Sequence, residues 1–178
     1  MNLEQFRAEK DQFFRSRNSP LKPELRVSFA GLAYFPPNPA LRFVCTFIPD
    51  PEQSATVMQT SSGSERVYLR LGWLEFLETR LAAFIPEGTD DTELFIPFRD
   101  ATSGSETYGS GRYLEARLHN GTVELDFNLA YNPYCAYSDG WSCPIPPLEN
   151  WLKIPILAGE KNFQKPIPQA VRVGGDDD

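Results

Sequence analysis

Two neighbouring stretches concentrate the side chains that could do chemistry, residues 95–113 (FIPFRDATSGSETYGSGRY) and residues 125–151 (LDFNLAYNPYCAYSDGWSCPIPPLENW). Charged, aromatic, Gly, Pro and Cys residues crowd together in both. Loops of this composition are costly to order, and they often carry function. Neither stretch matches a mechanistic signature, so the sequence indicates where a site lies without indicating the reaction or the ligand.

The first stretch is suited to holding an anion. Between residues 99 and 113 it has two guanidinium groups, two carboxylates, two phenols and three glycines. Arg99 and Arg112 could bind a carboxylate or phosphate through paired hydrogen bonds, and glycines let backbone amides approach an anion closely. Asp100 and Glu106 could equally neutralise the two arginines, so a ligand-binding loop and a structural salt-bridge loop both remain open. No Gly-Lys-Ser/Thr follows, which excludes a Walker loop, and there is no dinucleotide fingerprint.

Carboxylates are the best candidates for acid–base chemistry. Glu106, Asp126 or Glu149 could act as the base, while Arg99 or Arg112 holds an anionic group. The residues expected to bind a ligand are Arg99, Asp100, Thr102, Glu106, Tyr108, Arg112, Tyr113, Asp126, Asn128, Tyr131 and Asn132.

Cys135 and Cys143 are separated by seven residues. This spacing is too long for a CxxC redox pair, and the further Cys and His ligands of a zinc site are missing, so no metal ligands are assigned. The thiols could be buried small hydrophobes or a disulfide. We expect the Pro-bounded segment between them to fold back and bring them close enough to bond if oxidised. His119 is too remote along the chain to activate them, and Cys45 should be a separate buried thiol.

Composition excludes some classes of partner. The 178 residues carry a net charge of −7 without a concentrated basic patch, which argues against nucleic acids and anionic membranes. The acidic balance would suit a cation or a basic substrate, or would simply aid solubility. The N-terminus has no signal-peptide pattern and no stretch is long enough to span a membrane, so we expect a cytoplasmic protein unless a leader preceded this sequence. No cofactor and no oligomeric state are indicated.

The elements that must position these residues are mostly extended. Residues 2–18 are expected to form a helix capped by Asn2, with Gln5 at the third helical position. After Pro23 the hydrophobic period changes to two, which predicts strands at 25–30 and 41–48. Short strands are also expected at 54–60 and 66–71, around a turn at 61–64, and at 94–98. Residues 34–39 (YFPPNP) predict a stiff turn. Residues 73–85 fit a helix or two strands joined near 78–80, and we favour the strands.

A β-hairpin is the clearest local prediction. Asn120-Gly121 is the preferred type I′ pair and lies between strand-like runs at 112–119 and 122–129. A two-residue turn would place Tyr113 opposite Asn128 and Glu115 opposite Asp126, with Leu114 and Phe127 among the residues of the core face. Opposed carboxylates are unfavourable unless a cation, a shared proton or a neighbouring Arg relieves them. A site is one explanation; Arg117 reaching diagonally across an ordinary solvated face is the other.

These elements together predict a mainly β fold, an antiparallel β-barrel or sandwich-like meander with an N-terminal α-helix, although α+β by count is possible. We expect residues 1–178 to form a single domain with a β core at 25–162, a Pro-rich lariat at 131–150 and a loose tail at 163–178. The hairpin should bring the loop before Tyr113 and the lariat to the same end of the sheet, far from the Asn120-Gly121 turn.

The motifs FIPFRDATSGSETYGSGRYLEA, LDFNLAYNPYCAYSDGWSCPIPPLEN and AGEK at 158–161 resemble the bacterial and archaeal family called domain of unknown function 1684. The resemblance covers the whole chain from the FRAEKDQFF helix and implies no activity. Some relatives look exported, which leaves the compartment and the redox state of the two lariat thiols open. It places the following residues at the family's motif positions: Arg99, Asp100, Thr102, Gly104, Glu106, Tyr108, Arg112, Tyr113, Asp126, Asn128, Tyr131, Asn132, Cys135, Cys143, Glu149 and Asn150.

Two functions are compatible with the sequence. The leading one is binding of a small polar ligand or metal ion at one end of the sheet, with carboxylate-based catalysis as an extension. The alternative is a non-catalytic module that presents the Pro- and aromatic-rich segment 131–151 to a protein partner. A deep polar pocket would favour the first, and a flat apolar patch would favour the second.

Overall fold

The computed structural model describes residues 1–89 and 92–165. Within these residues, two α-helices and seven strands follow in chain order, with four short 3₁₀ turns. Their bounds are α1 Leu3–Arg15, α2 Pro23–Arg26, η1 Pro39–Leu41, β1 Arg42–Pro49, β2 Ala55–Gln59, β3 Glu65–Phe76, β4 Thr79–Pro86, β5 Glu93–Phe98, β6 Arg112–His119, β7 Thr122–Asp126, η2 Phe127–Leu129, η3 Tyr134–Ala136 and η4 Leu148–Asn150. In these residues no helix is long and apolar enough to cross a membrane.

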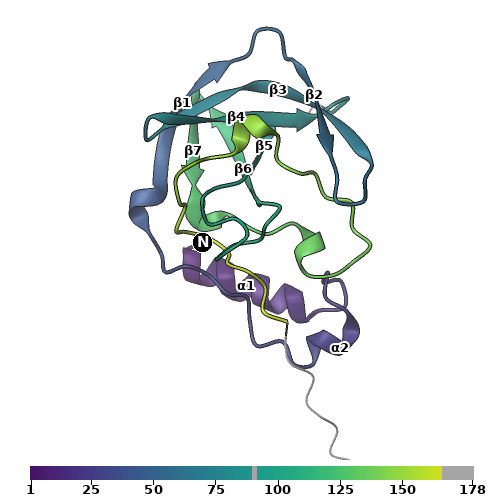
Figure 1. The fold of residues 1–178 in the computed structure, drawn as a ribbon. Helices are drawn as coiled ribbons and strands as arrows, with labels where there is room; N and C mark the ends of the chain where they lie inside the picture. Colours follow the sequence, from purple (N-terminus) through teal and green to yellow (C-terminus); the bar gives the residue numbers. More distant parts are fainter. Residues whose placement is uncertain (90–91, 166–178) are drawn as a thin grey trace, which may run out of the picture.

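Six antiparallel strands close into a barrel in the order β1-β7-β6-β5-β4-β3, and β2 pairs with β3 as an additional strand (Figure 1). The mainly β prediction is therefore confirmed. Closure depends on the 12-residue β3, which pairs with β2 along its first half and with β1 along its second. Gly72 lies at this junction opposite Pro49, and a Cβ there would be only 2.3 Å from the carbonyl oxygen of Ile48. Only glycine lets the two strands approach this closely.

The interior of the barrel is filled by side chains. Its buried cluster is aliphatic and aromatic and includes Leu74, Leu81, Ile96, Phe98 and Phe127, each no more than 1% exposed. A small barrel whose inward positions carry such large groups is a packed core. Sites for other molecules must therefore be sought on its surface and in the loops.

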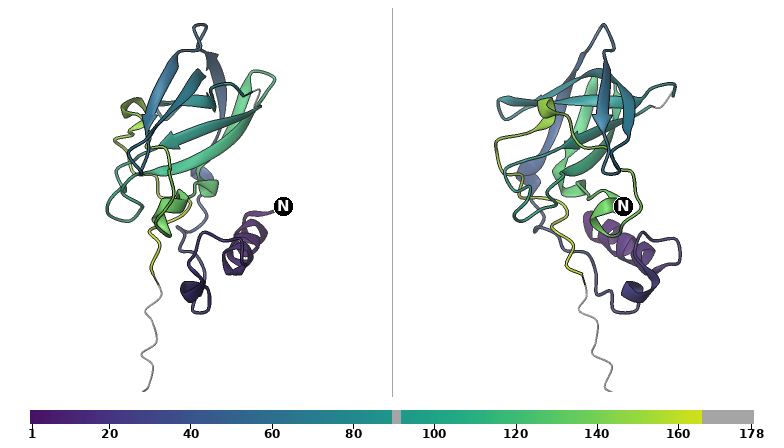
Figure 2. Two further views of the ribbon diagram at one scale, coloured as in Figure 1. Left: turned by 90° about the vertical axis from the view of Figure 1, so that its right-hand side faces the viewer. Right: turned by 45° about the vertical axis from the view of Figure 1, so that its right-hand side comes forward.

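Helix α1 lies outside the barrel, below its lower end in Figure 1, as Figure 2 also shows. The predicted cap is confirmed, because the Asn2 side chain accepts a hydrogen bond of 2.8 Å from the Gln5 backbone N–H. Phe14 is the buried residue of the helix and packs against Phe29 and, with ring centroids 4.8 Å apart, against Tyr137 of the lariat. The helix therefore has a small core of its own.

The strand predicted at residues 25–30 is wrong. Pro23 opens the short helix α2, and Val27 beyond it is 93% exposed. Proline fixes φ near the helical value and is favoured at a first helical position, so it outweighs the alternating pattern that follows. The strands favoured at residues 73–85 are confirmed as the end of β3 and β4, joined by Leu77 and Glu78 with φ of 43° and 58°. Most of the predicted tail, at 166–178, lies outside the described residues.

The hairpin prediction is confirmed at its turn and wrong at its far end. Leu118 pairs with Val123, and Asn120 and Gly121 have φ of 49° and 77°, as a type I′ turn requires. At the other end Tyr113 pairs with Tyr131 instead of Asn128. The 3₁₀ turn η2 inserts three residues into this strand and shifts the register. The faces still sort as predicted, because Leu114 and Phe127 both enter the core.

Candidate functional site

Arg112 is fully buried and is bound by the protein itself. Its Nη1 donates to the carbonyl oxygens of Ala158 (2.5 Å) and Glu160 (3.1 Å), and its Nη2 donates to the carbonyl of Ile156 (2.9 Å) and to Asp100 Oδ1 (3.4 Å). Burial lowers the pKa of Arg112, and Asp100 acts against that shift. The guanidinium thus fastens residues 156–160 to the barrel, and its fork is occupied by these oxygens.

Asp100 completes this arrangement, which we call the buried clamp (Asp100, Arg112 and the backbone of residues 156–160). The carboxylate accepts hydrogen bonds from the backbone N–H of Ile156 (2.7 Å) and from the Thr102 hydroxyl (2.8 Å). Gly111 turns the chain into β6 with φ of 101°, and a Cβ there would be 2.5 Å from the carbonyl oxygen of Phe98. Asp100, Thr102 and Arg112 are therefore turned inward, toward one another and toward residues 156–160.

A second buried group surrounds Glu160. Its carboxylate accepts hydrogen bonds from the Asn132 backbone N–H (2.8 Å) and the Tyr137 hydroxyl, and Lys10 Nζ of α1 lies 2.5 Å from it. Burial and then the charge of Glu160 raise the pKa of Tyr137, so its phenol remains a donor. Asn132 also donates to the carbonyl of Lys161. These contacts join the N-terminal helix, the lariat and the AGEK segment.

Two buried asparagines hydrogen-bond the backbone through both the oxygen and the nitrogen of the side-chain amide. Asn150 accepts from the Ala82 N–H (2.8 Å) and donates to the carbonyls of Ala82 (2.9 Å) and Pro97 (2.8 Å). Asn128 exchanges hydrogen bonds of 2.8 and 2.9 Å with the backbone of Asn38. Such amides replace missing sheet partners, so both residues hold the loops against the barrel.

The three carboxylates expected to act as a base lie in different environments. Glu106 is exposed, Asp126 accepts from the Asn128 backbone N–H at the start of η2, and Glu149 is paired with Arg70 at 3.0 Å. Arg99 stacks over the Trp151 ring, 4.2 Å from its centroid. These placements give no shared acid–base pair.

The surface between the barrel and the lariat is hollowed into what we call the aromatic cleft. It has a volume of about 360 Å³ and is lined by Arg66, Tyr113, Tyr131, Pro133, Tyr134, Trp141, Ser142, Cys143 and Pro144. Tyr113 and Tyr131 meet edge to face with centroids 5.8 Å apart, and Tyr134 and Trp141 do so at 5.0 Å. The Tyr113 hydroxyl donates to the carbonyl of Pro144 (2.5 Å), which fixes one wall.

The two charged side chains at this cleft, Glu115 and Arg66, differ in their hydrogen-bond partners. Burial raises the pKa of Tyr131, and its hydroxyl donates to the Glu115 carboxylate. Arg66 is exposed and forms no salt bridge among residues 1–89 and 92–165. The cleft therefore offers ring faces and edges, together with a guanidinium that has no carboxylate partner in the part of the chain that the structure describes.

A second hollow of about 390 Å³, which we call the thiol cleft, adjoins the first because Trp141 lines both. Its other lining residues are Ser61, Ser62, Tyr108, Cys135, Ser138, Asp139, Gly140 and Ser142. The Tyr108 hydroxyl lies 3.4 Å from Cys135 Sγ. Cys135 and Cys143 are both free thiols.

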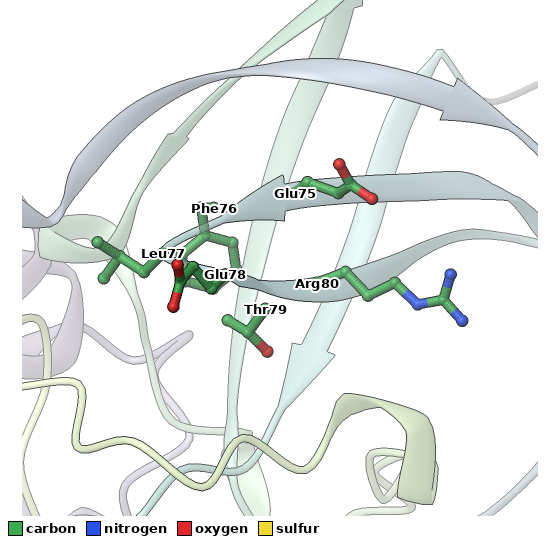
Figure 3. A pocket seen from close by; sticks show the side chains of 6 residues that line it. All are labelled: Glu75, Phe76, Leu77, Glu78, Thr79 and Arg80. Carbon is green, nitrogen blue, oxygen red and sulfur yellow. The ribbon is translucent and has the colours of Figure 1, made fainter.

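Two further hollows are weaker candidates for a binding site. One, of about 420 Å³, is lined only by the consecutive residues 75–80 of the β3–β4 hairpin (Figure 3), so it does not join distant segments. The other, of about 500 Å³, lies between the start of α1 and β7, and its Arg42 is paired with Glu124 at 2.6 Å. Within the part of the chain that the structure describes, no three His, Cys, Asp or Glu residues are placed to hold a metal ion.

The structure thus brings Tyr113 and Tyr131 of the expected ligand-binding set to one cleft and Tyr108 to its neighbour. Arg66 was missed, because on an alternating strand it looks like any solvent-facing charge. It reaches the cleft because the turn after β2 meets the lariat at the Thr60–Pro144 bridge. That contact between distant segments leaves no mark in the local sequence.

Comparisons with known proteins give a family and a fold. The model of the family described as Protein of unknown function (DUF1684) matches residues 27–161. The solution NMR structure of an uncharacterized protein of Haloarcula marismortui is 40% identical, with a TM-score of 0.68, over 89% of this chain and 91% of that one. No protein with a curated description matches the chain.

Proposed function

Because the chain belongs to the family Protein of unknown function (DUF1684), which supplies no activity, we propose a function from the cleft itself. The aromatic cleft binds a small molecule that carries a planar apolar ring and an anionic group. The observation that carries this proposal is the meeting of four aromatic side chains in one hollow with the guanidinium of Arg66, which forms no salt bridge within residues 1–89 and 92–165.

The ring would be recognised by the side chains of the lariat. Tyr134 and Trp141 are 38% and 41% exposed, which leaves part of each ring free for a ligand. Aromatic pairs with edge-to-face or offset geometry contribute about 0.5–1.5 kcal/mol beyond the area that they bury. The cleft volume of about 360 Å³ is also within the range of small-molecule sites.

The anionic group would be recognised by Arg66. A guanidinium binds a carboxylate through two parallel hydrogen bonds, and a hydrogen bond to a charged group is worth about 1.5–3 kcal/mol. Arg112 cannot serve in this way because it is fully buried and both of its Nη groups donate to Ile156, Ala158, Glu160 and Asp100. The proposed ligand thus differs from the polar ligand or metal ion expected from the sequence.

Isothermal titration calorimetry with 2-naphthoate as the probe would test the proposal. We expect measurable binding to the wild type and about 10- to 100-fold weaker binding to Arg66→Gln, which corresponds to the loss of one charge-assisted contact. Arg42→Gln is the matched control, because Arg42 is also an exposed strand arginine but lines the hollow beside α1. An absence of binding to the wild type, or an equal loss in both variants, would contradict the proposal.

The interaction module stays as a second candidate because of one observation. Leu148 and Trp151, in the last part of the 131–151 segment, are 75% and 43% exposed although both are large and apolar. Exposed apolar side chains of this size are typical of protein contacts when they are contiguous. A proline-rich peptide that binds the wild type but not Leu148→Ser, in a chain that does not bind 2-naphthoate, would favour this candidate over a small-molecule site.

A further inference from the structure

The lariat brings its two thiols together at the boundary between the two clefts. Cys135 lines the thiol cleft and Cys143 lines the adjoining aromatic cleft. Each thiol is the largest single influence on the pKa of the other, so the two sulfurs face each other across this boundary. The two thiols are the first and last residues of the nine-residue segment 135–143, which is flanked by Pro133 and Pro144. Both thiols are only partly buried.

The surroundings of Cys135 favour its thiolate. The sulfur accepts a hydrogen bond from the Tyr108 hydroxyl at 3.4 Å, and the Cys143 thiol can act as a second donor to it. The contact with Cys143 is the largest cause that lowers the pKa of Cys135 to about 6, and burial acts in the opposite direction. The same contact raises the pKa of Cys143 well above its ordinary value, so Cys143 is the member of the pair that keeps its proton.

A thiolate that is held beside a protonated second thiol and open to a cleft has the arrangement of an attacking and a resolving cysteine. Cys45 provides the contrast. It is 2% exposed, and burial raises its pKa, so it should be inert.

We propose that Cys135 and Cys143 form a redox-active dithiol that exchanges with small-molecule disulfides. In the first step Cys135 Sγ attacks one sulfur of the incoming disulfide, forms a mixed disulfide and expels one thiolate. In the second step Cys143 loses its proton to solvent and attacks Cys135 Sγ, which expels the second thiolate. The protein is oxidised by two electrons to a Cys135–Cys143 disulfide, and the small disulfide is reduced to two thiols.

The aromatic disulfide 5,5′-dithiobis(2-nitrobenzoate) would test this with the reduced full-length chain, because each released thiolate is coloured. We expect the wild type to release two equivalents quickly at pH 7 and to end with a Cys135–Cys143 disulfide in the peptide map. Cys143→Ser should release one fast equivalent and retain the mixed disulfide on Cys135. Cys135→Ser should lose the fast phase, and Cys45→Ser, the buried control, should behave as the wild type.

The pH dependence adds a second measurement. The rate of iodoacetamide labelling at Cys135, followed by mass spectrometry in the wild type, should have its midpoint near pH 6. Tyr108→Phe removes one donor to the sulfur and should move that midpoint upward. A midpoint near the ordinary thiol value of about 8.5, a fast phase that survives Cys135→Ser, or an oxidised protein without the Cys135–Cys143 bond would overturn the proposal. The labelling arm needs no variant, so a variant that fails to fold does not remove the test.

Discussion

Replacement of Arg112 by Met should destabilise the fold strongly, because the buried clamp would lose its central donor. Met keeps much of the volume but leaves Asp100 and the carbonyls of residues 156–160 buried without their partner. Removing one member of a buried ion pair costs about 3–5 kcal/mol. This is a large part of the roughly 5–15 kcal/mol by which domains are stable.

Urea unfolding followed by circular dichroism would measure this loss. With a slope of about 2 kcal/mol per molar urea, the midpoint of Arg112→Met should fall by about 1.5–2.5 M. Arg117→Met is the matched control on the same strand: Arg117 is 73% exposed and lies 3.8 Å from Glu93, so its loss should cost less than about 0.5 kcal/mol. If Arg112→Met unfolds like the wild type, the clamp is not structural and Arg112 becomes a candidate ligand residue again.

Three further predictions concern the loops and the barrel seam. Asn150→Ala should lower the free energy of unfolding by about 2–4 kcal/mol in urea titrations, because backbone groups that Asn150 pairs would be buried unsatisfied; a change below about 0.5 kcal/mol would contradict this. Gly72→Ala should prevent or severely weaken barrel closure, whereas Gly63→Ala, whose Cβ meets nothing within 4 Å, should cost only the strain of its positive φ; equal melting temperatures for the two variants would refute the seam argument. Burial alone would raise the pKa of Asp50, but hydrogen bonds, including one from Arg70, lower it below the ordinary value of 3.8. Because the pKa of Asp50 is lower in the folded state than in the unfolded chain, the ionised carboxylate stabilises the fold above pH 3.8, and this stabilisation is lost as the pH falls through the folded-state pKa. The melting temperature of Asp50→Asn should therefore change less between about pH 4 and pH 2 than that of the wild type.

Local signals predicted the local structure well. The Asn2 cap, the Asn120-Gly121 turn and the period of two along β1 each depend on a few neighbouring residues, and all three are present. The failures come from competing local rules. Pro23 began a helical turn where alternation suggested a strand, and η2 shifted a register that the turn alone had set.

The roles of the motif side chains could not be predicted in the same way. From the sequence, Arg112 could equally bind an anion or hold the fold together. Its structural role is visible only from the backbone carbonyls that it binds, and these lie 44–48 residues further along the chain. The place of Arg66 in the aromatic cleft also depends on a distant contact, because the turn after β2 meets Pro144. Pairings at this separation are set by barrel topology, which a single sequence does not encode locally.

The most direct test of the account is a ¹H–¹⁵N correlation NMR titration of the full chain with 2-naphthoate. We expect shifted amide signals to be confined to the aromatic cleft, around Arg66, Tyr131, Tyr134 and Trp141, while the amides of the buried clamp at Asp100 and residues 156–160 stay in place. Shifts centred on the buried clamp or on the hollow beside α1, or no shifts at millimolar probe, would contradict the claim that the motif side chains build the fold and that the cleft binds the ligand.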